Sequence, residues 1–217
     1  MAIGAAKTIS YPGIIVILGA AAISLSQVLL LGGFAVAQSA ASHPATPTYD
    51  ANNDLLLPKG FETWVFVGSN LGLAYKTELK EMTSAEGARL QSMRFHNVYI
   101  NPEAYEHFLA TGEFPESTIL VMEQFAAADK EPKGVLSAGY YDGSRVGLEV
   151  AVKNSARPDK AKTPWAYYDF TDHSDSKKAV AHAPAFPDDA CETCHRAHAS
   201  SDNVWVQFYP RLRDLNK

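Results

Sequence analysis

Apolar and polar residues alternate along much of the second half of the chain, with the period of two that is typical of half-buried strands. Residues 145–153 show it most clearly, because Val146, Leu148, Val150 and Val152 alternate with small or polar neighbours. One face of this strand is therefore expected to be buried. Four more stretches rich in β-branched and aromatic residues predict strands at 93–100, 118–125, 135–141 and 165–171.

The spacing of these strands predicts how they pair. Asp142-Gly143 separates the predicted strands 135–141 and 145–153, and this dipeptide favours a two-residue hairpin turn. Consecutive strands joined at hairpin spacing form antiparallel sheets. We therefore expect an α+β fold that is mainly antiparallel β-sheet with a few helices.

One helix has clear start and stop signals between residues 101 and 112. Asn101 can cap it, Pro102 suits its first position, and Gly112 is typical of the residue that follows a helix. Apolar residues at i, i+3 and i+4 give it one apolar face. Weaker patterns predict a short helix leading into a strand at 58–67. They also predict helices at 176–182, at 191–195 and at 202–215.

The first 37 residues differ from the rest. Lys7 is their only charged residue, residues 13–37 are almost all apolar or small, and Ala35-Val36-Ala37 resembles a signal cleavage site. We expect a cleaved signal peptide at 1–37, or alternatively an N-terminal membrane anchor, since the apolar run approaches membrane-spanning length. A polar linker would follow at 38–54, and one domain at 55–217.

The net charge argues against binding to nucleic acid. The whole chain carries −5, and without residues 1–37 it keeps 24 acidic and 18 basic residues, a net charge of −6. No stripe of basic residues is visible, and a general nucleic-acid binder needs one to neutralise phosphates.

Both cysteines of the chain lie in one short motif, Cys191-Glu192-Thr193-Cys194-His195. Two thiols at this spacing can each add to a vinyl group of one haem, and the adjacent imidazole can bind its iron. A thioredoxin-like pair would need a surrounding βαβ pattern, which is not evident. A zinc site would need two more ligands, and only His198 is near. The motif therefore predicts one covalent haem c, with His195 as the iron ligand.

The residue on the other side of the iron is not evident from the sequence. The chain has four methionines, at positions 1, 82, 93 and 122, and all precede the motif. Met122 falls in a strand pattern typical of a core residue. His198 shares a helical face with His195, so the two cannot bind opposite faces of one haem. We expect an open position that can take a small molecule.

Motifs along the domain carry a resemblance to a known family. Residues 55–213 resemble the cytochrome P-460 and cytochrome c′-beta family, in the family's order of motifs. The matching stretches are Leu55-Leu56-Leu57-Pro58, Trp64-Val65-Phe66-Val67-Gly68, Val98-Tyr99-Ile100-Asn101-Pro102-Glu103, Thr111-Gly112-Glu113-Phe114-Pro115, Gly147-Leu148-Glu149, Val152-Lys153-Asn154-Ser155, Arg157, the haem motif, and Phe208-Tyr209-Pro210 with Leu212-Arg213.

The resemblance implies a homodimer of β-rich subunits with a five-coordinate haem. It also implies one of two chemistries. The P-460 branch cross-links a lysine to the haem and oxidises hydroxylamine, whereas the c′-beta branch lines its distal pocket with phenylalanines and binds nitric oxide or carbon monoxide. Where the first branch would place its lysine, this chain has Arg94-Phe95-His96-Asn97, while Lys76 and Lys80 lie upstream. The chain is thus closer to the c′-beta branch.

The same resemblance suggests which residues surround the haem. Phe95 and Phe66 are the candidates for the distal phenylalanines, and each could instead be a core residue. His96 or Glu149 could act as a distal acid or base, although both are also compatible with solvent-facing positions. Arg213 could neutralise a haem propionate or lie in solvent.

Three functions follow in order of preference. The first is a periplasmic cytochrome that binds nitric oxide or a similar diatomic ligand. The second is an enzyme that oxidises hydroxylamine. The third is an electron-transfer cytochrome, which would need a filled sixth position; any of the three would exchange electrons with a partner cytochrome.

Overall fold

The computed structural model describes residues 45–73, 93–128, 139–157 and 163–214. The predicted signal segment 1–37, the first part of the predicted linker, Lys76, Lys80 and Met82 lie outside these residues. Within them, no helix is both long and apolar enough to cross a membrane.

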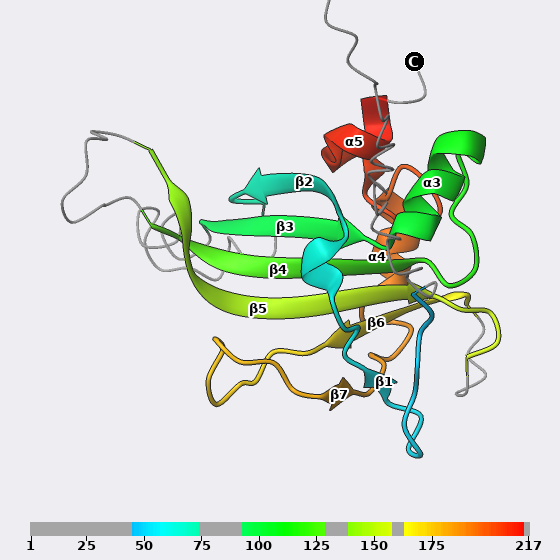
Figure 1. The fold of residues 1–217 in the computed structure, drawn as a ribbon, viewed down its shortest axis with the longest axis horizontal. Coiled ribbons are helices and arrows are strands. Elements are labelled where there is room, and N and C mark those ends of the chain that lie inside the picture. The colour runs from blue at the N-terminus through cyan, green and yellow to red at the C-terminus, as the bar shows by residue number, and fades with distance from the viewer. Residues whose placement is uncertain (1–44, 74–92, 129–138, 158–162, 215–217) are drawn as a thin grey trace, which may run out of the picture. The chain divides into compact units, whose positions relative to one another are not determined.

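A five-stranded antiparallel sheet forms the centre of the domain, and its strands follow one another in chain order (Figure 1). This confirms the predicted fold class. The strands are β2 (Val65–Leu71), β3 (Arg94–Ile100), β4 (Ile119–Ala128), β5 (Tyr141–Lys153) and β6 (Trp165–Asp169).

A second, two-stranded sheet pairs β1 (Leu55–Leu56) with β7 (His182–Ala183) in antiparallel register. The 3-10 helix η1 (Phe61–Thr63) then leads from β1 into β2, as the pattern at 58–67 predicts. The described part of the predicted linker is tied to this ribbon. Tyr49 pairs with Leu55, and the Leu56 amide donates to the Thr48 carbonyl at 2.8 Å.

The helix α3 (Pro102–Thr111) connects β3 to β4. Its predicted bounds are confirmed, and Gly112 follows it with φ 76°, a left-handed conformation that glycine adopts without a Cβ clash. The predicted side-chain cap is wrong. Asn101 makes no capping bond; instead its Oδ1 accepts from the Ile119 amide at 2.8 Å, and its Nδ2 donates to the Ser117 carbonyl at 3.3 Å. The asparagine therefore joins the helix start to β4.

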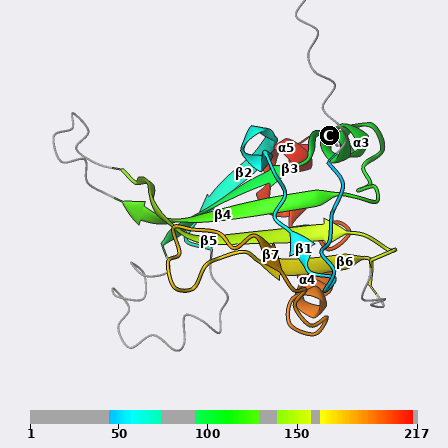
Figure 2. The ribbon, with the colours of Figure 1, turned by 60° about the horizontal axis from the view of Figure 1, so that its bottom comes forward.

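Three short helices follow the second sheet: α4 (Glu192–His198), the 3-10 helix η2 (Val206–Phe208) and α5 (Pro210–Arg213). Helix α4 lies beside β6 (Figure 2), and α5 packs on β2. At that second contact a Cβ on Gly68 would lie 3.0 Å from Pro210 Cδ, so glycine permits the close approach.

Each face of the large sheet is covered by its own apolar cluster. Paired residues of neighbouring strands point to the same face, so the register separates the two sets. The first face carries Ile100, Leu120 and Tyr167 and packs against α3, η2 and α5. The second face carries Val121 and Val150 and packs against the β1–β7 ribbon and η1.

Two predicted elements differ from the structure. Residues 141–153 form one continuous strand, so Asp142-Gly143 is not a hairpin turn. Its pairing continues to the end of β4, where Ala127 lies opposite Asp142, and this pairing outweighs the local turn preference. Residues 176–182 form turns, a bridge between Thr171 and Ala179, and the first residue of β7. They do not form a helix, since antiparallel contacts hold this segment against the chain that follows β6.

Candidate functional site

Helix α4 carries the Cys-x-x-Cys-His motif at its start. Cys191 is the N-cap residue, Cys194 follows within the first turn, and both thiols are free and partly buried. His195 is next along the helix, and its amide donates to the Cys191 carbonyl at 3.1 Å. One helical turn therefore presents two thiols and one imidazole together, which is the arrangement that the motif predicts.

The two ring nitrogens of His195 have different environments. Nδ1 lies 2.8 Å from the Asn203 carbonyl, which fixes Nδ1 as the protonated nitrogen and leaves the lone pair on Nε2. Trp205 Nε1 donates to Nε2 at 3.2 Å. The ring of Tyr167 lies 4.4 Å from the His195 ring, centroid to centroid. Burial lowers the pKa of His195, so the imidazole is neutral and able to bind a metal at neutral pH.

A tight turn after α4 delivers the carbonyl that orients His195. Asp202 and Asn203 have φ values of 42° and 62°, and Ser201 and Val204 pair across them. Both positions thus lie in the left-handed region, which Asp and Asn tolerate better than most residues. Asn203 Nδ2 also donates to Oε1 of Glu192 at 3.3 Å.

Glu192, the second residue of the motif, connects this turn to the helix. It is only 4% exposed, and its carboxylate binds the Asn203 amide and, at 3.3 Å, the Arg196 guanidinium. Sequence analysis did not single out Glu192, Asn203, Trp205 or Tyr167. The Asp-Asn pair at 202–203 was the available signal for the turn, but the sequence does not show which carbonyl meets His195.

The first face of the sheet, on which the motif packs, carries a polar network. Gln124 Nε2 donates to Glu149 Oε1 at 2.7 Å, and Arg94 Nη1 donates to Gln124 Oε1 at 3.2 Å. His96 pairs with Gln124 in the register, so its half-buried side chain points to the same face. Of the predicted residues, the structure brings His96 and Glu149 to the motif's side of the sheet.

Glu149 is electrostatically close to the motif. Burial raises the pKa of the Cys191 thiol, and the negative charge of Glu149 raises it further. Glu149 is thus an acid or base candidate on the motif's side of the sheet.

Phe66 and Phe95, the expected distal phenylalanines, lie on the opposite face. Phe66 pairs with Tyr99, and their rings are 5.6 Å apart on the face that packs against the β1–β7 ribbon. Phe95 and Asn97 share that face. The two phenylalanines expected to line the distal side of the haem therefore lie on the face of the sheet away from α4.

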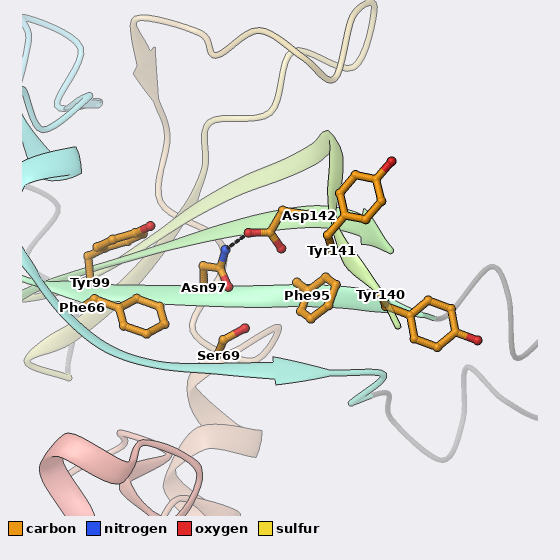
Figure 3. Close-up of a pocket in the computed structure, with 8 residues that line it drawn as sticks. All are labelled: Phe66, Ser69, Phe95, Asn97, Tyr99, Tyr140, Tyr141 and Asp142. Atoms are coloured by element: carbon orange, nitrogen blue, oxygen red, sulfur yellow. Dashed lines mark hydrogen bonds between the residues drawn. The ribbon is translucent and has the colours of Figure 1, made fainter. Parts of the chain in front are cut away.

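Figure 3 shows where these phenylalanines point. They line an open groove of about 430 Å³ whose other walls include Tyr140 and Tyr141. At its base Asn97 Nδ2 donates to Asp142 Oδ2 at 2.7 Å. Phe66 is 41% exposed in this groove. The groove is a separate feature from the motif's surroundings.

Arg213 lies at the protein surface. Its Nε donates to Asp214 Oδ1 at 3.0 Å and its Nη1 to the Gln207 carbonyl at 3.1 Å. The side chain is 46% exposed, so in this conformation it pairs with a neighbour in solvent. Met122 is partly buried on the motif's face, where it packs against the first cluster as a core residue would.

The donor set fits a haem attached through cysteine. Cys191 and Cys194 are unpaired thiols on one helical turn, and the Nε2 lone pair of His195 is directed by the bond at Nδ1. Binding of iron at Nε2 requires the Trp205 indole to give up its bond to that nitrogen. A zinc site is less well supported, since the metal-ligand clusters found among the described residues do not include the motif.

Comparison with known proteins gives one family. A sequence model of the family described as Cytochrome P460 matches residues 58–206, which span the sheet and the Cys-x-x-Cys-His motif. No curated protein matches the chain significantly.

Proposed function

The chain belongs to the cytochrome P460 family, which implies a haem cofactor, and we propose that it is an exported c-type cytochrome whose single haem binds a small ligand. The observation that supports this most directly is the motif on α4 with its oriented imidazole. Cys191 and Cys194 would hold the haem through two thioethers, and His195 Nε2 would be its axial ligand. A haem held by these residues would supply an iron able to bind a small molecule.

The protein's own residues would stabilise this arrangement. The Asn203 carbonyl keeps the proton of His195 on Nδ1 and sets the ring's orientation, and the hydrogen bond makes the imidazole a stronger ligand. Glu192 holds the turn that carries this carbonyl. Tyr167 packs against the ring and helps to exclude water from it.

We propose nitric oxide or another diatomic molecule as the ligand. Where the P-460 branch would carry a cross-linking lysine, β3 has the stretch Arg94-Phe95-His96-Asn97, which contains no lysine. The Arg94 guanidinium binds Gln124. Lys153 lies on the motif's face of the sheet, where its ammonium group donates to the Phe114 carbonyl and to the Asp202 carboxylate. An uncross-linked haem suits gas binding. Phe66 and Phe95 are not part of this site, because they lie on the opposite face of the sheet.

One observation favours a second candidate, the oxidation of hydroxylamine. Glu149 lies on the motif's side of the sheet, and Gln124 donates to one of its oxygens. A carboxylate oriented in this way could accept protons from hydroxylamine as it is oxidised. His96 points to the same face and is an alternative proton acceptor.

The test is an absorption spectrum of the purified ferrous protein before and after nitric oxide is added, together with an assay of hydroxylamine oxidation. We expect an ordinary high-spin c-type Soret band that shifts with nitric oxide, and no turnover of hydroxylamine. A strongly red-shifted and broadened Soret band would instead mean that a side chain is bonded to the haem ring.

The matched variants Glu149→Gln and Glu123→Gln separate the two candidates. Both residues are partly buried glutamates on central strands, but they point to opposite faces of the sheet. If the protein oxidises hydroxylamine with Glu149 as base, Glu149→Gln should lower the rate about 100-fold or more. Glu123→Gln should leave it unchanged. Turnover that depends on Glu149 in this way would refute the gas-binding proposal.

Export and assembly are part of the proposal. The apolar segment 1–37 supports export to a periplasm, where the haem would be attached and a partner cytochrome would exchange electrons with it. The family resemblance supports a homodimer. Fractionation of expressing cells and light scattering of the purified protein test these two points.

A further inference from the structure

A cluster of nitrogen and oxygen donors lies far from the haem motif, at the ribbon formed by β1 and β7. Asp50, Asp54 and His182 each direct one donor atom to a common point, and these atoms lie within 4.8 Å of one another. His182 Nδ1 is 3.2 Å from Asp54 Oδ2 and 3.3 Å from Asp50 Oδ2. We propose that this cluster is a binding site for a divalent transition-metal ion of the Zn²⁺ class.

The distances fit the proposal. Zn²⁺ binds nitrogen and oxygen ligands at about 2.0–2.2 Å, and two ligands of a tetrahedral site are then about 3.3 Å apart. Both nitrogen-to-oxygen distances agree with this separation. The donor set also fits, because one imidazole with two carboxylates combines ligands that borderline metals accept and leaves a position for water.

Local structure orients the Asp50 carboxylate, and the turn holds Asp54 next to it, before any ion binds. Asp50 Oδ1 accepts from the amides of Asn52 and Asp54, at 2.8 and 3.0 Å, so its other oxygen is the one turned to His182. The Asp50 amide donates to the Asp54 carbonyl at 2.9 Å, which closes the turn between them. Pre-organised ligands lose little conformational freedom on binding, and this favours affinity.

The imidazole comes from a distant part of the sequence. His182 pairs with Leu56 in the β1–β7 register, and this pairing brings it beside the turn at 50–54. Two carboxylates that point toward one nitrogen bring two negative charges close together, and a cation between them would offset their repulsion. A divalent ion would supply such a charge.

An ion at this site would fasten the start of the domain to β7. Residues 48–56 run along the ribbon, with hydrogen bonds between Asp50 and Asp54 and between Thr48 and Leu56. The proposed site would join this segment to β7, which follows β6 and precedes the haem motif. The site is independent of haem chemistry, since none of its three ligands lies in α4 or in the polar network around Glu149.

The experiment measures metal binding by the full-length protein with its haem in place. Zn²⁺ is titrated calorimetrically, and Co²⁺ is used as a spectroscopic probe of the ligands. We expect one saturable Zn²⁺ site at this cluster, in addition to any Zn²⁺ that other residues bind. Zn²⁺ should also raise the midpoint temperature of thermal unfolding. Asp54→Asn and His182→Gln should each weaken that site by at least about tenfold, the low end for loss of even an outer-shell partner.

His173→Gln is the matched control. His173 Nε2 lies 3.0 Å from Asp169 Oδ2 in another histidine–aspartate pair. Among the described residues this pair is not part of a group of three possible metal ligands. This variant should bind Zn²⁺ as the unmodified protein does. If Zn²⁺ binding is absent, or is equal in all three variants, the cluster is only an ion pair between imidazolium and carboxylates. Selective binding of Ca²⁺ over Zn²⁺ would likewise refute the proposed ligand class.

Discussion

Replacement of Asn203 tests whether the tight turn after α4 sets the orientation of the iron-binding histidine. Asn203 has φ 62°, and its carbonyl accepts from His195 Nδ1. Asn203→Ala keeps that carbonyl but places a Cβ in the left-handed region, which costs about 1–2 kcal/mol. Asn203→Gly removes the strain but makes the unfolded chain more flexible, which costs about 0.5–1 kcal/mol. The two variants thus separate backbone strain from side-chain loss.

Loss of the Asn203 side chain costs the same stability in both variants. Its Nδ2 donates to Oε1 of Glu192, which is 4% exposed, at 3.3 Å. Hydrogen bonds to charged groups contribute about 1.5–3 kcal/mol, and this one is long, so we assign it about 1 kcal/mol. Glu192 retains the Arg196 guanidinium as a partner. Asn203→Gly should therefore lower the free energy of unfolding by about 2 kcal/mol, and Asn203→Ala by about 2–3 kcal/mol.

The assay is urea unfolding of the protein with haem attached, combined with an absorption spectrum of each variant. We expect Asn203→Ala to be the less stable by about 0.5–1 kcal/mol and to show the larger change in the iron's spectrum, because strain displaces the carbonyl. Asn203→Asp tolerates the backbone but sets a carboxylate against Glu192, so it should be destabilised as well. If Asn203→Ala is as stable as Asn203→Gly with an unchanged spectrum, the turn does not control His195.

Three further predictions concern the sheet. Asn101→Ala leaves the buried Ile119 amide without its acceptor and should lower the free energy of unfolding by about 1–3 kcal/mol, measured with urea. Gly68→Ala would put a Cβ 3.0 Å from Pro210 Cδ, and such overpacking should lower the free energy of unfolding by about 1–3 kcal/mol. It should also displace α5, which the haem spectrum would detect. Unchanged stability would mean that α5 shifts freely. Burial raises the pKa of Glu123, so the folded protein disfavours its ionised form. The resulting stability is present at low pH and lost as pH rises through the folded pKa, so Glu123→Gln should gain stability over the unmodified protein from about pH 4 upward. A constant difference between them at every pH would contradict this.

Much of the fold was predictable because its signals are local. The period of two at 145–153 reports burial of one strand face, and residues Leu148, Val150 and Val152 are indeed buried. Asn101-Pro102 and Gly112 bound a helix because their backbone preferences are intrinsic. The turn predicted at Asp142-Gly143 is wrong because a non-local contact outweighs the local signal. The pairing of β5 with the end of β4 is stronger than the turn preference of this dipeptide.

The chemistry of the motif can be read from the amino-acid sequence alone: two thiols and an imidazole at haem-binding spacing, near the end of a chain built mainly of strands. Which residues accompany that motif depends on how the chain folds. Phe66 and Phe95 lie in segments with the alternating pattern of strands, but this pattern does not show which face of the sheet α4 covers. That depends on the strand register and on the path of the chain after β6. The same register brings Glu149 and His96 to the motif's side and sends the phenylalanines to the other, and a distant turn supplies the carbonyl that orients His195.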